Sequence, residues 1–106
     1  MKEKEFWKYD SAKEDLQSYL VIRKLEKNVV HISVYNISLN GEIFDVSHIP
    51  IDYDILKNSL KEKIINNKYE EDDSFSDGFN NWEESNGGVW EKPVKEVIKY
   101  IKETVM

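Results

Sequence analysis

The pair Asn40-Gly41 constrains the fold more than any other feature of this 106-residue chain. It stands between two runs rich in β-branched and aromatic residues, 29–39 and 42–49. Two-residue turns between antiparallel strands favour Asn-Gly because both central positions need positive φ. Counting outward from the turn gives four facing pairs, namely Leu39 with Glu42, Ile37 with Phe44, Tyr35 with Val46, and Ser33 with His48. The sequence therefore predicts a β-hairpin over these two runs.

The alternation of side chains along the hairpin predicts two faces of different character. The expected core face carries the more apolar set, which is Tyr35, Ile37, Leu39, Phe44 and Val46. The other face mixes apolar and polar side chains, namely Ile32, Val34, Ile43 and Ile49 with Asn36, Asp45 and Ser47. We therefore expect other elements to cover part of both faces.

The segment before the hairpin also favours strands. Residues 19–26 are rich in strand-forming types and turn at Lys27-Asn28, which predicts a third antiparallel strand. Residues 6–9 are expected to form another short strand or an arm. Between them, Ser-Ala-Lys-Glu from Ser11 has the form of a capping box and predicts a short helix over 11–17.

After Pro50 the apolar period changes to that of a helix. Tyr53, Leu56, Leu60 and Ile64 predict a helix over 53–66, and the rings at 75, 79 and 82 predict one over 74–85 with all three on one side. Pro93 begins a third helix, whose apolar stripe is Val94, Val97, Ile98, Ile101 and Val105 and whose solvent-facing side carries Lys95, Lys99 and Lys102. These patterns predict one α+β domain over residues 1–106. We expect an antiparallel β-meander of three or four strands with two or three helices, the C-terminal half being mainly helical.

The composition excludes several classes of site. The chain has no cysteine, so disulfides, thiolate nucleophiles and zinc–thiolate sites are ruled out. No phosphate-binding glycine loop, dinucleotide fingerprint or hydrolase elbow is present. We expect no cofactor and no enzymatic activity. Without a signal-like N-terminus or a long apolar run, the expected location is the cytoplasm, away from membranes.

Negative charge is concentrated in one part of the chain. Of the 21 acidic residues, eight fall within residues 69–91, which contain no Lys or Arg, and the other 13 are set against 15 basic residues. Such a field repels nucleic acid and attracts basic proteins. The expected partner-binding residues are Glu70, Glu71, Asp72, Asp73, Asp77, Phe79, Trp82, Glu83, Glu84 and Trp90. The competing interpretation assigns Phe75 and these aromatic residues to the core and the acids to a solvated connector.

The two histidines, His31 and His48, fall on one sheet face as diagonal neighbours, with Lys24 beside them. Two imidazoles and a lysine could perform acid–base steps of RNA cleavage, and two imidazoles could hold a metal. An acidic protein is poorly charged for RNA and no third ligand is evident, so hydrogen bonding at one end of the sheet is the favoured interpretation. A calcium loop with ligands Asp73, Asp77 and Glu84 is disfavoured, because Phe75 would take its third position.

Three segments give the chain a resemblance to a known class of proteins. They are VVHISVYNISLNGEIFDVSHIPI, LKNSLKEKI and FSDGFNNWEESNGGVWEKPVKEVI. In these segments the chain resembles the small acidic immunity proteins that bacteria encode beside polymorphic or contact-dependent toxins. The resemblance implies a single domain that inhibits a toxin by direct binding. The leading hypothesis is thus a non-enzymatic immunity or antitoxin protein. The alternatives are a small hydrolase or ribonuclease that uses the histidine pair, and a homodimeric assembly module.

Overall fold

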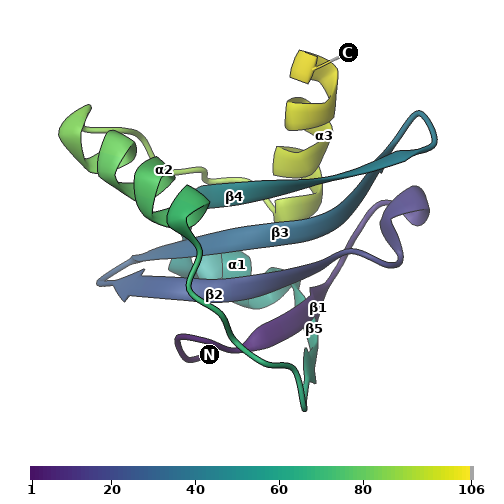
Figure 1. Cartoon of the computed structure of the whole chain (residues 1–106), viewed down its shortest axis with the longest axis horizontal. Coiled ribbons are helices and arrows are strands. Elements are labelled where there is room, and N and C mark those ends of the chain that lie inside the picture. Colours follow the sequence, from purple (N-terminus) through teal and green to yellow (C-terminus); the bar gives the residue numbers. More distant parts are fainter. Residues whose placement is uncertain (106) are drawn as a thin grey trace.

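The computed structural model describes residues 1–105 as a five-stranded antiparallel sheet with helices on both faces (Figure 1). The elements in chain order are β1 (Phe6–Tyr9), the 3₁₀ turn η1 (Lys13–Asp15), β2 (Tyr19–Glu26), β3 (Val29–Leu39), β4 (Glu42–Asp52), α1 (Tyr53–Ser59), β5 (Leu60–Ile64), α2 (Asp73–Glu84) and α3 (Val94–Val105). The predicted α+β class is confirmed, with five strands where three or four were expected. None of the helices in residues 1–105 is long and apolar enough to cross a membrane.

The strand order β4-β3-β2-β1-β5 is a meander with one strand added at its far edge. The predicted helix over 53–66 is wrong beyond Ser59, because residues 60–64 form β5 instead. In β5, Ile64 pairs with Phe6 and Leu60 pairs with Tyr9. This pairing satisfies backbone groups on the open edge of β1, a non-local gain that the local helical period does not reveal.

The β3–β4 hairpin follows the predicted register only near its turn. Leu39 faces Glu42 and Ile37 faces Phe44 as expected, but the predicted partners Tyr35 with Val46 and Ser33 with His48 are wrong. Val46 pairs with Val34, since β3 has one extra residue where Asn36 adopts a positive φ of 59°. Ile49 then pairs with Ile32, which places an extra residue in β4. Two bulges therefore interrupt the alternation.

The bulges change which side chains share a face. Tyr35, predicted to lie on the core face, instead faces Tyr19 on the opposite side, and Leu39 lies half-buried near the turn. The two sets expected on opposite faces contribute to one core. Its buried members are Tyr9, Leu20, Ile22, Val30, Ile32, Val34, Ile37, Ile49, Ile51, Leu56, Val94, Val97 and Ile98, with Phe44 and Val46 packed against them.

The predicted helix over 11–17 is shortened to the turn η1, and Ser11 does not cap it. The side chain of Asp15 points inward and accepts hydrogen bonds from the Ser38 amide and the Lys102 ammonium, at 2.8 and 2.6 Å. Lys102 is consequently only 9% exposed, although its helix face was predicted to be solvated. Lys95 and Lys99 are exposed as expected.

Helices cover the two faces of the sheet unequally. α1 and α3 lie on the core side, whereas α2 crosses one end of the other side (Figure 1). The segment between α2 and α3 is tied to β4 at Trp90, whose amide donates to Pro50 and whose carbonyl accepts from the Asp52 amide, at 3.0 and 2.9 Å. At the start of residues 69–91, the Glu70 carbonyl accepts from Arg23 of β2, so both ends of this segment are tied to the sheet and α2 lies between them.

Candidate functional site

The helix α2 lies on the sheet through its aromatic side, as its sequence spacing predicts. The rings of Phe79 and Trp82 meet His31 edge-on, with centroids 4.9 and 4.7 Å away, and Phe75 meets His48 at 5.6 Å. Gly78 allows this approach, since a Cβ there would lie 2.9 Å from Cβ of His48. The aromatic side of α2 therefore packs directly against the two imidazole rings.

The two imidazoles form a hydrogen-bonded chain with Glu26. His31 Nε2 lies 2.8 Å from Glu26 Oε1, and His31 Nδ1 lies 2.9 Å from His48 Nε2. An ionised carboxylate can only accept, so His31 must carry its proton on Nε2. Its Nδ1 then accepts from the Nε2–H of His48, and the tautomer of each ring follows from chemistry. The sequence prediction that His31 and His48 are neighbours is confirmed, and Lys24 pairs with His31 in the sheet.

The surroundings of both histidines favour the neutral ring. Burial lowers the pKa of His31, opposed mainly by Glu26, and burial together with the nearby His31 lowers the pKa of His48 to about 4. His31 is fully buried, so a macromolecular substrate cannot reach it. Within residues 1–105 no group of three or more His, Cys, Asp or Glu side chains is placed to hold a metal ion. The hydrogen-bonded chain from Glu26 through His31 to His48 therefore joins strands β2, β3 and β4.

The acids of residues 69–91 lie mainly on the surface. Seven of the eight belong to exposed residues, namely Glu70, Glu71, Asp73, Asp77, Glu83, Glu84 and Glu91. The eighth, Asp72, accepts from the Ser74 amide at the start of α2 and lies 3.5 Å from the guanidinium of Arg23. Asp73, Asp77 and Glu84 are on the helix itself, so they do not form a calcium loop.

The aromatic residues predicted to bind a partner differ in exposure. Phe79 is only 8% exposed and belongs to the contact between α2 and the sheet. Trp82 is half-buried, its Nε1–H donating to the Gly88 carbonyl at 2.8 Å, and it borders a surface hollow of about 290 Å³. Trp90 is half-buried against the core and against Tyr100, and borders a second hollow of about 320 Å³. Two tryptophans thus remain partly accessible among the acids.

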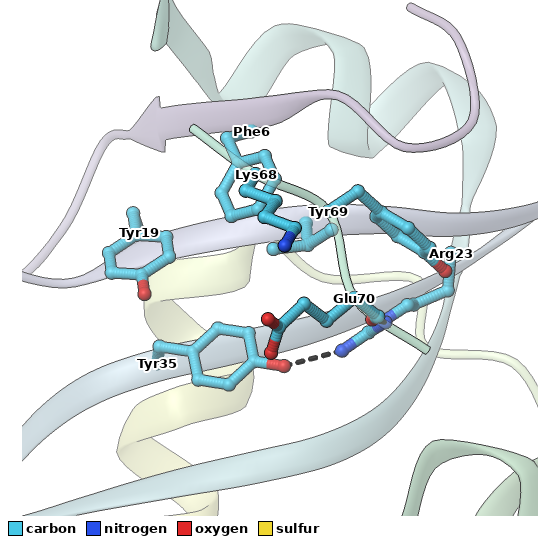
Figure 2. Close-up of a pocket in the computed structure, with 8 residues that line it drawn as sticks. Phe6, Tyr19, Arg23, Tyr35, Lys68, Tyr69 and Glu70 are labelled. Atoms are coloured by element: carbon cyan, nitrogen blue, oxygen red, sulfur yellow. Dashed lines mark hydrogen bonds between the residues drawn. The ribbon is translucent and has the colours of Figure 1, made fainter. Parts of the chain in front are cut away.

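Arg23, the only arginine in the chain, was not predicted to have a functional role. Its guanidinium donates to the Ser33 hydroxyl, the Glu70 carbonyl and the Tyr35 hydroxyl, and the ring of Tyr69 lies 5.1 Å from it. Figure 2 shows this group at one end of a pocket that Phe6, Tyr19, Tyr35 and the coil at 68–70 surround. The signal that could have revealed it is a charged residue directly after the apolar run Leu20–Ile22, within a predicted strand.

Comparisons with protein-family models, with curated proteins and with solved structures find no match to this chain.

Proposed function

We propose that this chain is a non-enzymatic protein-binding domain that docks a basic partner on the acidic surface of α2 and its flanking segments. On the resemblance to immunity proteins, the partner is a toxin that the domain neutralises by direct binding. The observation that carries the proposal is that the two sides of α2 differ in what they contact. Its rings pack against the sheet, while Asp73, Asp77, Glu83 and Glu84 are exposed on a helix held in one orientation.

The physical basis is electrostatic steering combined with apolar anchoring. A surface of one sign accelerates encounter with a basic partner and fixes its orientation. Affinity at protein interfaces comes mainly from a few well-packed residues, among which tryptophan is enriched. Trp82 and Trp90, each beside a hollow at the edge of the acidic surface, are suited to that role.

The test begins with capture of partners from the source organism at low salt, followed by purification of the basic protein that a salt step releases. The combined variant Asp73→Asn, Asp77→Asn, Glu84→Gln should weaken binding by roughly tenfold or more and flatten its salt dependence. A matched variant, Asp10→Asn, Glu42→Gln, Glu62→Gln, removes the same charge from exposed residues elsewhere and should change the affinity less than about twofold. Equal effects of the two variants, or no effect of the first, would contradict the proposal.

A further inference from the structure

A cavity of about 190 Å³ lies beside the N-terminal end of α2, on the same face of the sheet. The rings of Phe6, Tyr19 and Tyr35 form its walls in a continuous stack across three strands, with centroids 6.0 and 5.3 Å apart. Val21, which is only 1% exposed, also lines it. Figure 2 shows these rings around the hollow, with the coil at 68–70 crossing it. We call this cavity the tyrosine pocket.

Hydrogen-bond donors line the tyrosine pocket. The hydroxyl of Tyr35 accepts from Arg23, so its own O–H is left to donate, and the adjacent guanidinium polarises it. Tyr19 supplies a second hydroxyl, and Figure 2 shows the ammonium of Lys68 directed toward the hollow. Apolar walls combined with a few donors suit a ligand that has an apolar body and an acceptor group.

The charge around the pocket favours an anionic acceptor. The Arg23 side chain is only 3% exposed, and its cation lies directly behind the Tyr35 hydroxyl. Lys68 lies at the mouth, and Lys4 stands 5.6 Å from the Tyr69 ring. Asp72 balances part of this charge at 3.5 Å from Arg23. The opposing group is Glu70, an exposed residue that also lines the pocket.

We propose that the tyrosine pocket binds small aromatic carboxylates. The ring of the ligand packs against Phe6, Tyr19 and Val21, and its carboxylate accepts from the Tyr35 hydroxyl and pairs with Lys68. The size agrees, because an apolar protein cavity of about 150 Å³ is known to hold benzene. A pocket of about 190 Å³ has room for one ring and a carboxylate. This site goes beyond the proposed function and does not depend on it.

The test is an NMR titration of the full chain with benzoate, followed at the methyl groups of Val21. Benzoate should give saturable shifts, and benzyl alcohol, which has the same ring without the charge, should bind about tenfold more weakly. Tyr35→Phe should weaken benzoate binding by about tenfold. Lys68→Met, at an exposed position where folding is not at risk, should weaken it by roughly two- to fivefold.

Glu70→Gln provides a test of opposite sign. Removing the opposing carboxylate should tighten benzoate binding by roughly two- to fivefold. Glu42→Gln changes the net charge equally but lies at the start of β4, outside the pocket lining, and should leave the affinity unchanged. The proposal is overturned if wild-type shifts do not saturate, if benzyl alcohol binds as tightly as benzoate, or if the Lys68 and Glu70 variants both match wild type.

Discussion

Replacing Gly78 with alanine tests the close packing of α2 on the sheet. Within a helix, alanine is favoured over glycine by about 1 kcal/mol. A Cβ at position 78, however, would lie 2.9 Å from Cβ of His48. That atom is fixed to the backbone of β4 and cannot rotate away, so relief requires a shift of the whole helix. Helix propensity and packing therefore predict opposite signs for one substitution.

Packing should prevail. Overpacking costs about 1–3 kcal/mol, so subtracting the gain in propensity leaves a net loss of about 1 kcal/mol in the free energy of unfolding. For a domain of this size the thermal midpoint should fall by roughly 4–8 °C. Asn80→Ala, at an exposed position of the same helix, is the matched control and should stabilise by a few tenths of a kcal/mol, roughly.

Urea denaturation followed by tryptophan fluorescence measures the free energy of unfolding of both variants. A Gly78→Ala variant as stable as Asn80→Ala would show that the expected clash with His48 does not occur. Combining Gly78→Ala with each of two His48 variants identifies the contact responsible for the loss of stability, because His48→Ala retains the contacting Cβ and His48→Gly removes it. The penalty of Gly78→Ala should persist in the first background and disappear in the second. A penalty of equal size in both would show that another contact causes it.

Two further changes test buried charge. Because the pKa of His48 is about 4 in the folded chain against 6.5 for a free histidine, the unfolded chain binds the proton more tightly. The free energy of unfolding should therefore fall as the pH drops from about 6.5 to about 4, by roughly 3 kcal/mol at most. Urea titrations at each pH should show a smaller loss for His48→Gln than for the wild type. An equal loss in the two proteins would exclude His48 as its source. Lys102→Met leaves the buried carboxylate of Asp15 without its cation and should destabilise by about 3–5 kcal/mol, whereas Lys99→Met, on the exposed side of α3, should have little effect in the same thermal unfolding measurement.

The local parts of the fold were predictable from sequence because their signals are local. The Asn40-Gly41 turn, the rings of α2 and the apolar stripe of α3 each depend on residues a few positions apart. The bulges in β3 and β4 were not predictable, since a register count assumes strict alternation and Asn36 gives only a weak indication of positive φ. For the same reason β5 was missed, because its pairing partner lies more than fifty residues away in sequence.

The candidate site was likewise predictable from the sequence only in part. The proximity of His31 and His48 followed from the hairpin even though the predicted pair of Ser33 with His48 was wrong, because the bulges displaced His48 without moving it out of reach. The role of Glu26 in this hydrogen-bonded chain was not predicted. Nor was the tyrosine pocket, since Phe6, Arg23 and Tyr69 come together only when β1, β2 and the coil before α2 are assembled.

The inner position of β1 has a consequence for how the chain is synthesised. Among the strands of this sheet β1 is made first, yet its outer neighbour β5 is made last, so this edge of β1 is open until residues 60–64 emerge. Open edges recruit strands from other chains and lead to aggregation. The shortness of β1 and the charge of Lys8 limit that hazard during translation. In the finished fold, loss of these four residues would open the edges of β2 and β5 together, so the N-terminal segment also protects the folded protein from aggregation.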